Sequence, residues 1–295
     1  MEKGWTLKKF LAKMPALHDP ILIEGLPGIG NVGKITADFI ADEVQAQPLL
    51  RLQSTALPNS AFVGEDNLLE LPAIDIYYKK YPKAKSGGKQ GNADGKRDIS
   101  AISKQGKKGS CGEVEAKAGK RDLLFVVGDI QPSNEEASYE LCDTLLGIMQ
   151  DMKVKEFITL GGVGLPSPPE NPRLFITGNS NAIVRKYLKG TSATDKLFGA
   201  IGPIVGVTGL LVGLAKYRKI PGVCILAETH AHPLHLGIKG SRQMVSLLDN
   251  KLGLGVDLKR LDREVKSAEK ELSKRLKQVK GQLKDNDQED ASYIR

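Results

Sequence analysis

Cysteine is rare in this chain of 295 residues, and long apolar runs are absent. Cys111, Cys142 and Cys224 are odd in number and scattered, without metal-ligand spacing. This excludes a disulfide-stapled secreted scaffold and fits a reducing cytoplasm. No stretch approaches the roughly 18 uninterrupted apolar residues of a membrane span. The first nine residues also lack the apolar stretch of a signal peptide. We therefore expect a cytoplasmic protein without a membrane partner.

Aromatic residues are also scarce, at 5% of the chain, and none occurs in residues 83–121. The formal net charge of +8 would normally suggest nucleic acid as a partner. Residues 79–121 alone, however, contain 13 Lys/Arg and 4 Asp/Glu, so the remainder sums to about −1. A basic segment without aromatics offers no platform for base stacking. We expect a disordered insertion over about 83–121 and do not expect nucleic acid as the partner. Weak, salt-sensitive contact of this segment with nucleic acid or an acidic surface is the alternative.

The most informative stretch is the glycine-rich run Glu24–Lys34, which follows the apolar residues Ile21–Ile23. Its Gly28, Gly30 and Gly33 match the G-x-G-x-x-G of dinucleotide-binding folds. Those folds also place an Asp or Glu about 20 residues further on, at the end of the next strand. The next strand predicted here ends without an acidic residue, so this signature is incomplete.

The same run nearly spells a P-loop. Residues 28–34 read G-x-x-x-x-G-K, but Ile35 stands where the hydroxyl that binds magnesium is needed. Two interpretations stay open: a tight turn whose glycines allow positive φ and close packing, or an anion site at a helix N-terminus. Both assign the loop to the same residues: Gly25, Gly28, Gly30, Gly33 and Lys34. We expect no cofactor, and we expect the protein to act without ATP.

Strand-like and helix-like segments alternate along the chain, which predicts an α/β fold. We predict strands at Ile21–Ile23, Leu49–Gln53, Asp122–Gly128, Glu156–Leu160, Leu174–Thr177 and Gly222–Ala227. We predict helices at Thr36–Glu43, from a capping box at Ser133–Glu136 onward, at Leu210–Lys216 and at Arg242–Leu252. A β-hairpin is predicted with arms Leu68–Leu71 and Ile74–Tyr78. The predicted α/β domain spans residues 1–255 and is interrupted, not divided, by the basic insertion.

The character of the chain changes beyond Gly255. Apolar residues recur there at steps of three and four with charges between them, namely Leu258, Leu261, Val265, Ala268, Leu272, Leu276, Val279 and Leu283. This spacing predicts an amphipathic helix over 256–284 that packs on the domain or on a sister subunit. A flexible, acidic tail over 285–295 follows, with the apolar residues Tyr293 and Ile294 near its end.

The case for an active site is thin. His230, His232 and His235 follow the last predicted strand as H-x-H-x-x-H, and with Glu228 they are weak candidates for a metal site. The loop spacing imposes no geometry on them, so surface or packing histidines are the favoured interpretation and no metal is expected. The nucleophile motif G-x-S-x-G is absent. We therefore predict that the protein is not an enzyme.

Two motifs together carry a resemblance. The run Ile21–Lys34 and the run Gly202–Leu211 resemble the proteasome assembly chaperone family, and most closely its archaeal homo-oligomeric branch. Val223–Thr229 looks like the family's late strand ending in Glu-Thr. The likeness covers most of Pro20–Leu258, apart from the insertion. It implies a three-layer α/β/α domain with the shape of nucleoside phosphorylases and without an established enzymatic activity.

The resemblance also implies partners. Family members self-associate and assist the assembly of proteasome α-subunits, and some dock through a flexible C-terminus that ends in hydrophobic-Tyr-any residue. Here Tyr293 falls in the hydrophobic position, Ile294 replaces the tyrosine and Arg295 follows. The resemblance thus implies a homo-oligomer that binds α-subunits through these three residues. The alternative is a nucleotide- or nucleoside-binding enzyme that uses the Gly25–Lys34 loop.

Overall fold

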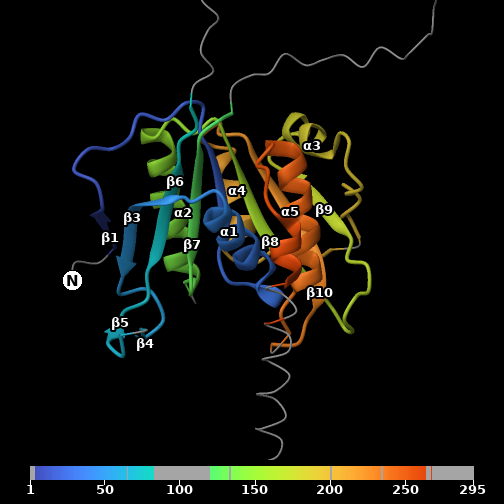
Figure 1. Cartoon of the computed structure of the whole chain (residues 1–295), viewed down its shortest axis with the longest axis horizontal. Coiled ribbons are helices and arrows are strands. Elements are labelled where there is room, and N and C mark those ends of the chain that lie inside the picture. The colour runs from blue at the N-terminus through green and yellow to red at the C-terminus, as the bar shows by residue number, and fades with distance from the viewer. Residues whose placement is uncertain are drawn as a thin grey trace, which may run out of the picture. The chain divides into compact units, whose positions relative to one another are not determined.

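A central mixed sheet organises the protein (Figure 1). The computed structural model describes residues 4–64, 66–82, 120–132, 134–199, 201–233, 235–263 and 267. The sheet has eight strands in the order β1-β3-β6-β7-β2-β8-β10-β9. Four neighbouring strands in its middle run parallel: β7 (Leu123–Gly128), β2 (Ile21–Gly25), β8 (Glu156–Leu165) and β10 (Gly222–His230).

The parallel strands are continuous apolar runs because both faces of the sheet are covered. All five residues of β2 are buried, and so are the first five of β7 and of β8. Cys224 lies in β10 and Cys142 in helix α2, and both are buried free cysteines. Exposures of 0% for Cys142 and 1% for Cys224 confirm that these cysteines are core residues, and burial raises the pKa of each thiol to about 12.

Antiparallel strands complete both edges of the sheet. One edge is formed by β1 (Trp5–Lys9), β3 (Gln47–Ser54) and β6 (Ile74–Lys79), and the other by β9 (Leu174–Gly178). The predicted hairpin is wrong. Strand β6 pairs with β3 and β7, whereas β5 (Leu69–Glu70) pairs with β4 (Phe62–Val63) in a separate two-stranded sheet. Pairing with β3 and β7 places Ile74 and Ile76 of β6 in the core, where both side chains are fully buried. This burial favours the central sheet over a local hairpin.

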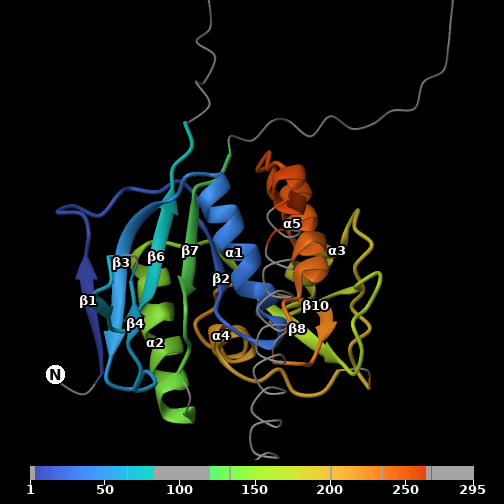
Figure 2. The same cartoon turned by 60° about the horizontal axis from the view of Figure 1, so that its bottom comes forward.

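Helices cover both faces of the sheet, which makes three layers (Figures 1 and 2). Helices α1 (Val32–Glu43) and α5 (Ile238–Leu252) pack side by side on one face. Helices α2 (Glu135–Asp151) and α4 (Val207–Ala215) pack together on the opposite face. Helix α3 (Asn181–Leu188) packs on β9 and β10. The predicted three-layer α/β fold is confirmed.

Local chemistry sets the ends of these helices. Helix α2 begins one residue later than the predicted capping box requires, because the side chain of Asn134 accepts a hydrogen bond from the backbone N–H of Ala137 at 2.8 Å. Helix α3 was not predicted. Its signal is the N-cap Ser180 ahead of the apolar pair Ile183 and Tyr187, both of which are buried.

Residues 81–120 form a unit of their own, of which the structure describes only Tyr81, Pro82 and Lys120. The predicted insertion over about 83–121 therefore lies almost entirely outside the described residues. The two strands that flank it, β6 and β7, are antiparallel neighbours in one sheet. In the part of the chain that the structure describes, no helix is long and apolar enough to cross a membrane.

Candidate functional site

The glycine loop lies where open α/β sheets bind ligands. Neighbouring strands β2 and β7 send their helices, α1 and α2, to opposite faces of the sheet. Such a reversal is the usual ligand site in this kind of fold. A crevice of about 210 Å³ does lie there, with Lys34, Gly128 and Asp129 in its lining. The five residues predicted to form the turn or anion site span this junction, since Gly25 ends β2, Gly28 and Gly30 lie in the loop, and Gly33 and Lys34 belong to the first turn of α1.

Packing explains three of the glycines. A Cβ atom on Gly33 would lie 2.3 Å from the carbonyl oxygen of Leu160 in β8. A Cβ on Gly25 would lie 2.4 Å from the carbonyl oxygen of Gly33. Gly30 has a φ of 62°, and a Cβ there would lie 2.5 Å from the hydroxyl of Thr229. These contacts are the ones that the close-packing interpretation requires, with α1 pressed onto the sheet.

Lys34 is already paired within the crevice. Its Nζ lies 2.8 Å from Oδ2 of Asp38 and 2.9 Å from Oδ1 of Asp129, the residue after β7. Burial lowers the pKa of Lys34, but hydrogen bonds and charges from the two carboxylates outweigh it and hold the pKa above its ordinary value. The loop's one cation is therefore neutralised twice over, which weakens its attraction for a phosphate.

We predict that Gly33→Ala lowers the free energy of unfolding by about 1–3 kcal/mol, because the new methyl group meets backbone atoms that cannot move aside. Gly28→Ala is the matched control, since a Cβ there meets nothing within 4 Å and its φ of −159° is extended backbone. Urea unfolding measures both variants. Equal stabilities for G33A and G28A would contradict the packing interpretation.

A carboxylic acid is buried beneath the crevice. Glu24, at 0% exposure, accepts a hydrogen bond from the backbone N–H of Leu26 at 2.9 Å, and the Thr208 hydroxyl lies 3.4 Å from its other oxygen. Burial raises the pKa of Glu24 to about 7 against these hydrogen bonds, which lower it. Thr208 belongs to the first turn of α4, so Glu24 also lies at the positive end of that helix.

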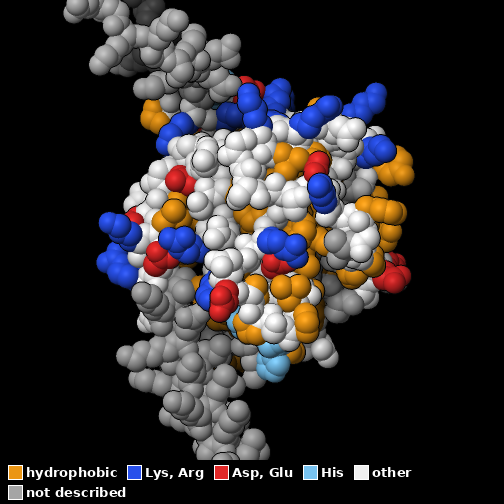
Figure 3. Space-filling model, turned by 90° about the vertical axis from the view of Figure 1, so that its right-hand side faces the viewer, with side chains coloured by type: hydrophobic (Ala, Val, Ile, Leu, Met, Phe, Trp, Pro, Cys, Tyr) orange, Lys and Arg blue, Asp and Glu red, His pale blue; other side chains and the backbone are white. Residues whose placement is uncertain are grey.

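The three candidate histidines do come together at the end of β10, whose last residue is His230. The ring centroid of His230 lies 5.7 Å from that of His232, in a stacked arrangement, and 5.3 Å from that of His235, edge to face. Histidine side chains gather at the lower edge of the face seen in Figure 3. Nevertheless, the described residues contain no group of three or more His, Cys, Asp or Glu side chains that could hold a metal ion.

Glu228, the fourth weak metal candidate, forms an ion pair with Arg173 instead. Its two carboxylate oxygens accept hydrogen bonds from the backbone N–H of Arg173 at 2.9 Å and from the guanidinium Nε at 2.7 Å. Burial raises the pKa of Glu228, but these bonds and the charge of Arg173 hold it below its usual value. The pair ties β10 to the segment that leads into β9.

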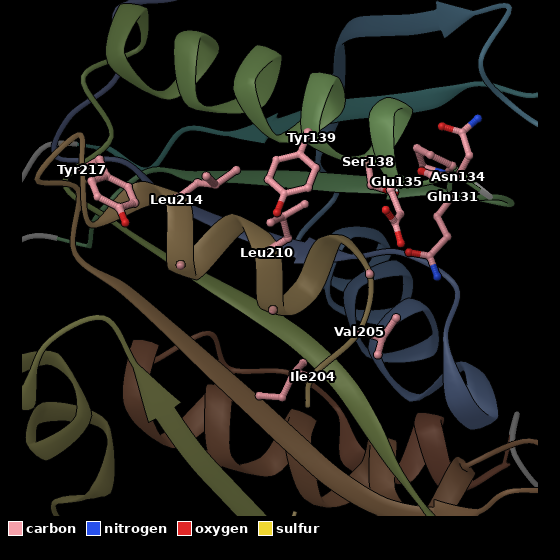
Figure 4. A pocket seen from close by; sticks show the side chains of 14 residues that line it. Gln131, Asn134, Glu135, Ser138, Tyr139, Ile204, Val205, Leu210, Leu214 and Tyr217 are labelled. Carbon is pink, nitrogen blue, oxygen red and sulfur yellow. Dashed lines mark hydrogen bonds between the residues drawn. The ribbon is translucent and has the colours of Figure 1, made fainter. Parts of the chain in front are cut away.

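A groove runs between α2 and α4 on the face opposite α1 (Figure 4). Its volume is about 880 Å³, and we call it the α2–α4 groove. Its apolar lining is Tyr139, Ile204, Val205, Leu210, Leu214 and Tyr217. Tyr139 points from α2 toward Leu210 of α4. Several of these side chains are open to solvent: Tyr139 is 55% exposed, Val205 84% and Tyr217 85%.

The two walls of the α2–α4 groove differ in charge. Helix α2 contains five Asp/Glu and no Lys/Arg, and all five acids are exposed. Helix α4 contains no charged residue at all, yet Gly213 is exposed and Leu210 and Leu214 are half-buried. An apolar helix on a surface is expected to be covered. The groove therefore leaves apolar side chains of both helices open to solvent, and it was not predicted.

Comparison with known proteins decides the family. The sequence profile of the PAC2 family matches residues 22–276. This chain belongs to the PAC2 family. The match runs from β2 through the end of the described chain, so the crevice, the histidines and the α2–α4 groove all lie within the PAC2 region. The predicted family is confirmed.

Solved PAC2-like structures share the fold. The chain is similar to Pyrococcus furiosus PbaB, described as an archaeal proteasome activator, with 27% identity and a TM-score of 0.73 over 92% of this chain and 98% of that one. It is also similar to P. furiosus PbaA, an archaeal homologue of proteasome-assembly chaperone, with 19% identity and a TM-score of 0.66 over 99% and 100% of the two chains. An uncharacterized protein of Methanocaldococcus jannaschii is 25% identical over 213 residues, which are 72% of this chain and 67% of that protein.

The remaining predicted site lies outside the described residues. This holds for Tyr293, Ile294 and Arg295, and for most of the predicted helix over 256–284. The described start of that helix agrees with its pattern, since residues 258–263 are helical and Leu261 is 2% exposed. Arg260 pairs with Asp42 at 2.6 Å and with Glu43 at 2.7 Å, which holds this start against α1.

Proposed function

We propose that this PAC2-family protein is a proteasome assembly chaperone-like or proteasome-binding protein that acts as a cytoplasmic homo-oligomer on proteasome α-subunits. The single observation that supports it most is the PAC2 match over residues 22–276, joined to the structural similarity with PbaB over 92% of this chain. The body serves as a scaffold, performs no chemistry and needs no cofactor or ATP. The α-subunit contact belongs to the tail that ends in Tyr293, Ile294 and Arg295.

Multivalency is the physical core of the proposal. One short tail offers a single apolar anchor and a carboxylate, which is a weak contact. Several tails on one homo-oligomer reach neighbouring α-subunits together, and effective concentration then raises the overall affinity by roughly 10²- to 10⁴-fold. The helix that begins at Leu258 projects each tail from a fixed point, where Arg260 pairs with Asp42 and Glu43.

Two modes of action are compatible with the relatives. PbaB is described as a proteasome activator and PbaA as a homologue of an assembly chaperone. The sequence identity is higher to PbaB, at 27%, than to PbaA, at 19%, and this favours binding to finished particles over ring assembly.

Native mass spectrometry of the purified chain mixed with free α-subunits, and separately with finished core particles, tests the proposal. We expect a complex with core particles or with rings of α-subunits, and a rise in peptide hydrolysis if the chain opens the pore. The absence of a complex with either partner at tens of micromolar would overturn the proposal.

The alternative, a nucleotide- or nucleoside-binding enzyme, has the position of the glycine loop in its favour. The pairing of Lys34 with Asp38 and Asp129 stands against it. We predict no heat of binding in calorimetry with ATP, NAD or nucleosides, with or without magnesium. Micromolar affinity that disappears in the Gly30→Val variant would favour the enzyme instead.

A further inference from the structure

The α2–α4 groove is complementary to the sequence beyond Arg263 in apolar character and in charge. We infer that the groove binds residues 264–284 of a second copy of this chain, which we call the basic segment. This inference rests on the homo-oligomer of the proposed function and names the surface that builds it.

Apolar surface matches apolar surface. The groove presents Tyr139 from α2, Leu210 and Leu214 from α4, and Tyr217 from the turn that follows α4. The basic segment places Val265, Leu272, Leu276, Val279 and Leu283 on one stripe of the helix predicted for it. An amphipathic helix that lays such a stripe into an apolar groove is a recurring mode of recognition.

Lengths also agree. At 1.5 Å per residue, the 17 residues of α2 extend about 26 Å and a helix of the 21 residues 264–284 would extend about 32 Å. The segment is thus long enough to follow the whole groove.

Charge complementarity selects the occupant and its direction. Glu135, Glu136 and Glu140 lie in the first half of α2, and Glu135 lines the groove. Lys216, Arg218 and Lys219 follow α4 at the other end of the groove, where Arg218 pairs with Asp143 and the two lysines add positive charge. The basic segment has three acids and two Lys/Arg in residues 264–271, but five Lys/Arg and no acid in 272–284. Its second half therefore lies against the start of α2, and its first half against residues 216–219.

The path of the chain makes the occupant a second copy. Arg260 pairs with Asp42 and Glu43, and Asp262 pairs with Arg242, so the helix that leads into the basic segment starts on the α1 and α5 face. The groove is on the opposite face of the sheet. Binding between copies is then head to tail, and it generates a ring if the rotation closes.

Mixing two full-length variants tests this. The groove variant carries Tyr139→Lys and Val205→Lys, at positions 55% and 84% exposed, where lysine does not disturb the core. The segment variant carries Leu276→Glu and Val279→Glu. We expect each variant alone to associate at least tenfold more weakly than the parent chain, in light scattering without any α-subunit. An equimolar mixture forms a one-to-one heterodimer, because one intact segment meets one intact groove.

The control variant carries Val63→Lys and Leu69→Lys, at positions 69% and 74% exposed on β4 and β5, and keeps the parent assembly. A parent chain that stays monomeric, variants that assemble as the parent does, or a mixture that stays monomeric would each overturn the inference. Because no α-subunit is present, such a failure leaves the proteasome contact of the proposed function standing. Loss of α-subunit binding with an intact assembly would indicate the reverse.

Discussion

Deleting Ser292–Arg295 is expected to weaken binding to rings of α-subunits by roughly 10²- to 10⁴-fold, the whole of the multivalent gain. The four residues contain both large apolar side chains at the end of the sequence, Tyr293 and Ile294. Without them each arm of the oligomer loses its anchor, so the loss multiplies over the arms. Interferometry on immobilised rings measures it.

The matched control deletes Asn286–Glu289, which removes the same number of residues and keeps the last six. This control shortens the arm without altering its end, and its affinity should stay within a few-fold of that of the parent chain. Ile294→Tyr is a second variant, which restores the family's ending, and we expect it to bind more tightly. Unchanged binding after deletion of Ser292–Arg295 would discard the tail mechanism.

The free energy of unfolding of the wild-type chain, relative to that of the Glu24→Gln variant, is expected to fall by about 3 kcal/mol between pH 4 and pH 8. The pKa of Glu24 rises from 4.5 to about 7 on folding, because burial penalises the charged form. The folded state therefore holds a proton that the unfolded state releases between these values. The stabilisation is complete below pH 4.5 and disappears as the pH approaches 7, at about 1.4 kcal/mol per pKa unit.

Urea unfolding at several pH values measures this difference, in which the titration of other groups cancels. Glu140→Gln provides the control, since Glu140 is exposed on α2. A wild-type-minus-E24Q difference that stays constant from pH 4 to pH 8 would contradict the assigned burial and protonation of Glu24.

Much of the fold follows from local pattern. The buried runs at Ile21–Ile23 and Leu123–Val127 could only be central strands, and the glycine loop between strand and helix was placed correctly. Elsewhere the structure differs from what the local sequence pattern predicts, because tertiary contacts determine it. Strand β8 continues through Gly161–Gly164, which looked like a loop, because it keeps its parallel pairing with β10. Gly162 is needed there since a Cβ would lie 2.2 Å from the carbonyl oxygen of Ile29.

The candidate site, too, was predictable from the sequence only in part. The sequence marks Lys34 as a candidate ligand for anions, but it does not reveal that Asp129, about a hundred residues away, folds onto the same ammonium group. The α2–α4 groove could not be predicted from the sequence for a similar reason. Tyr139 and Leu210 belong to helices far apart in sequence, and each looks like an ordinary core residue until the helices pack.

The most direct test of the account uses the intact chain as bait in a native extract of its own source and identifies the bound proteins by mass spectrometry. The account predicts that proteasome α-subunits are the most enriched partners and that they vanish when the bait lacks Ser292–Arg295. A bait that captures no α-subunit, or one that captures them equally well without those residues, would contradict it.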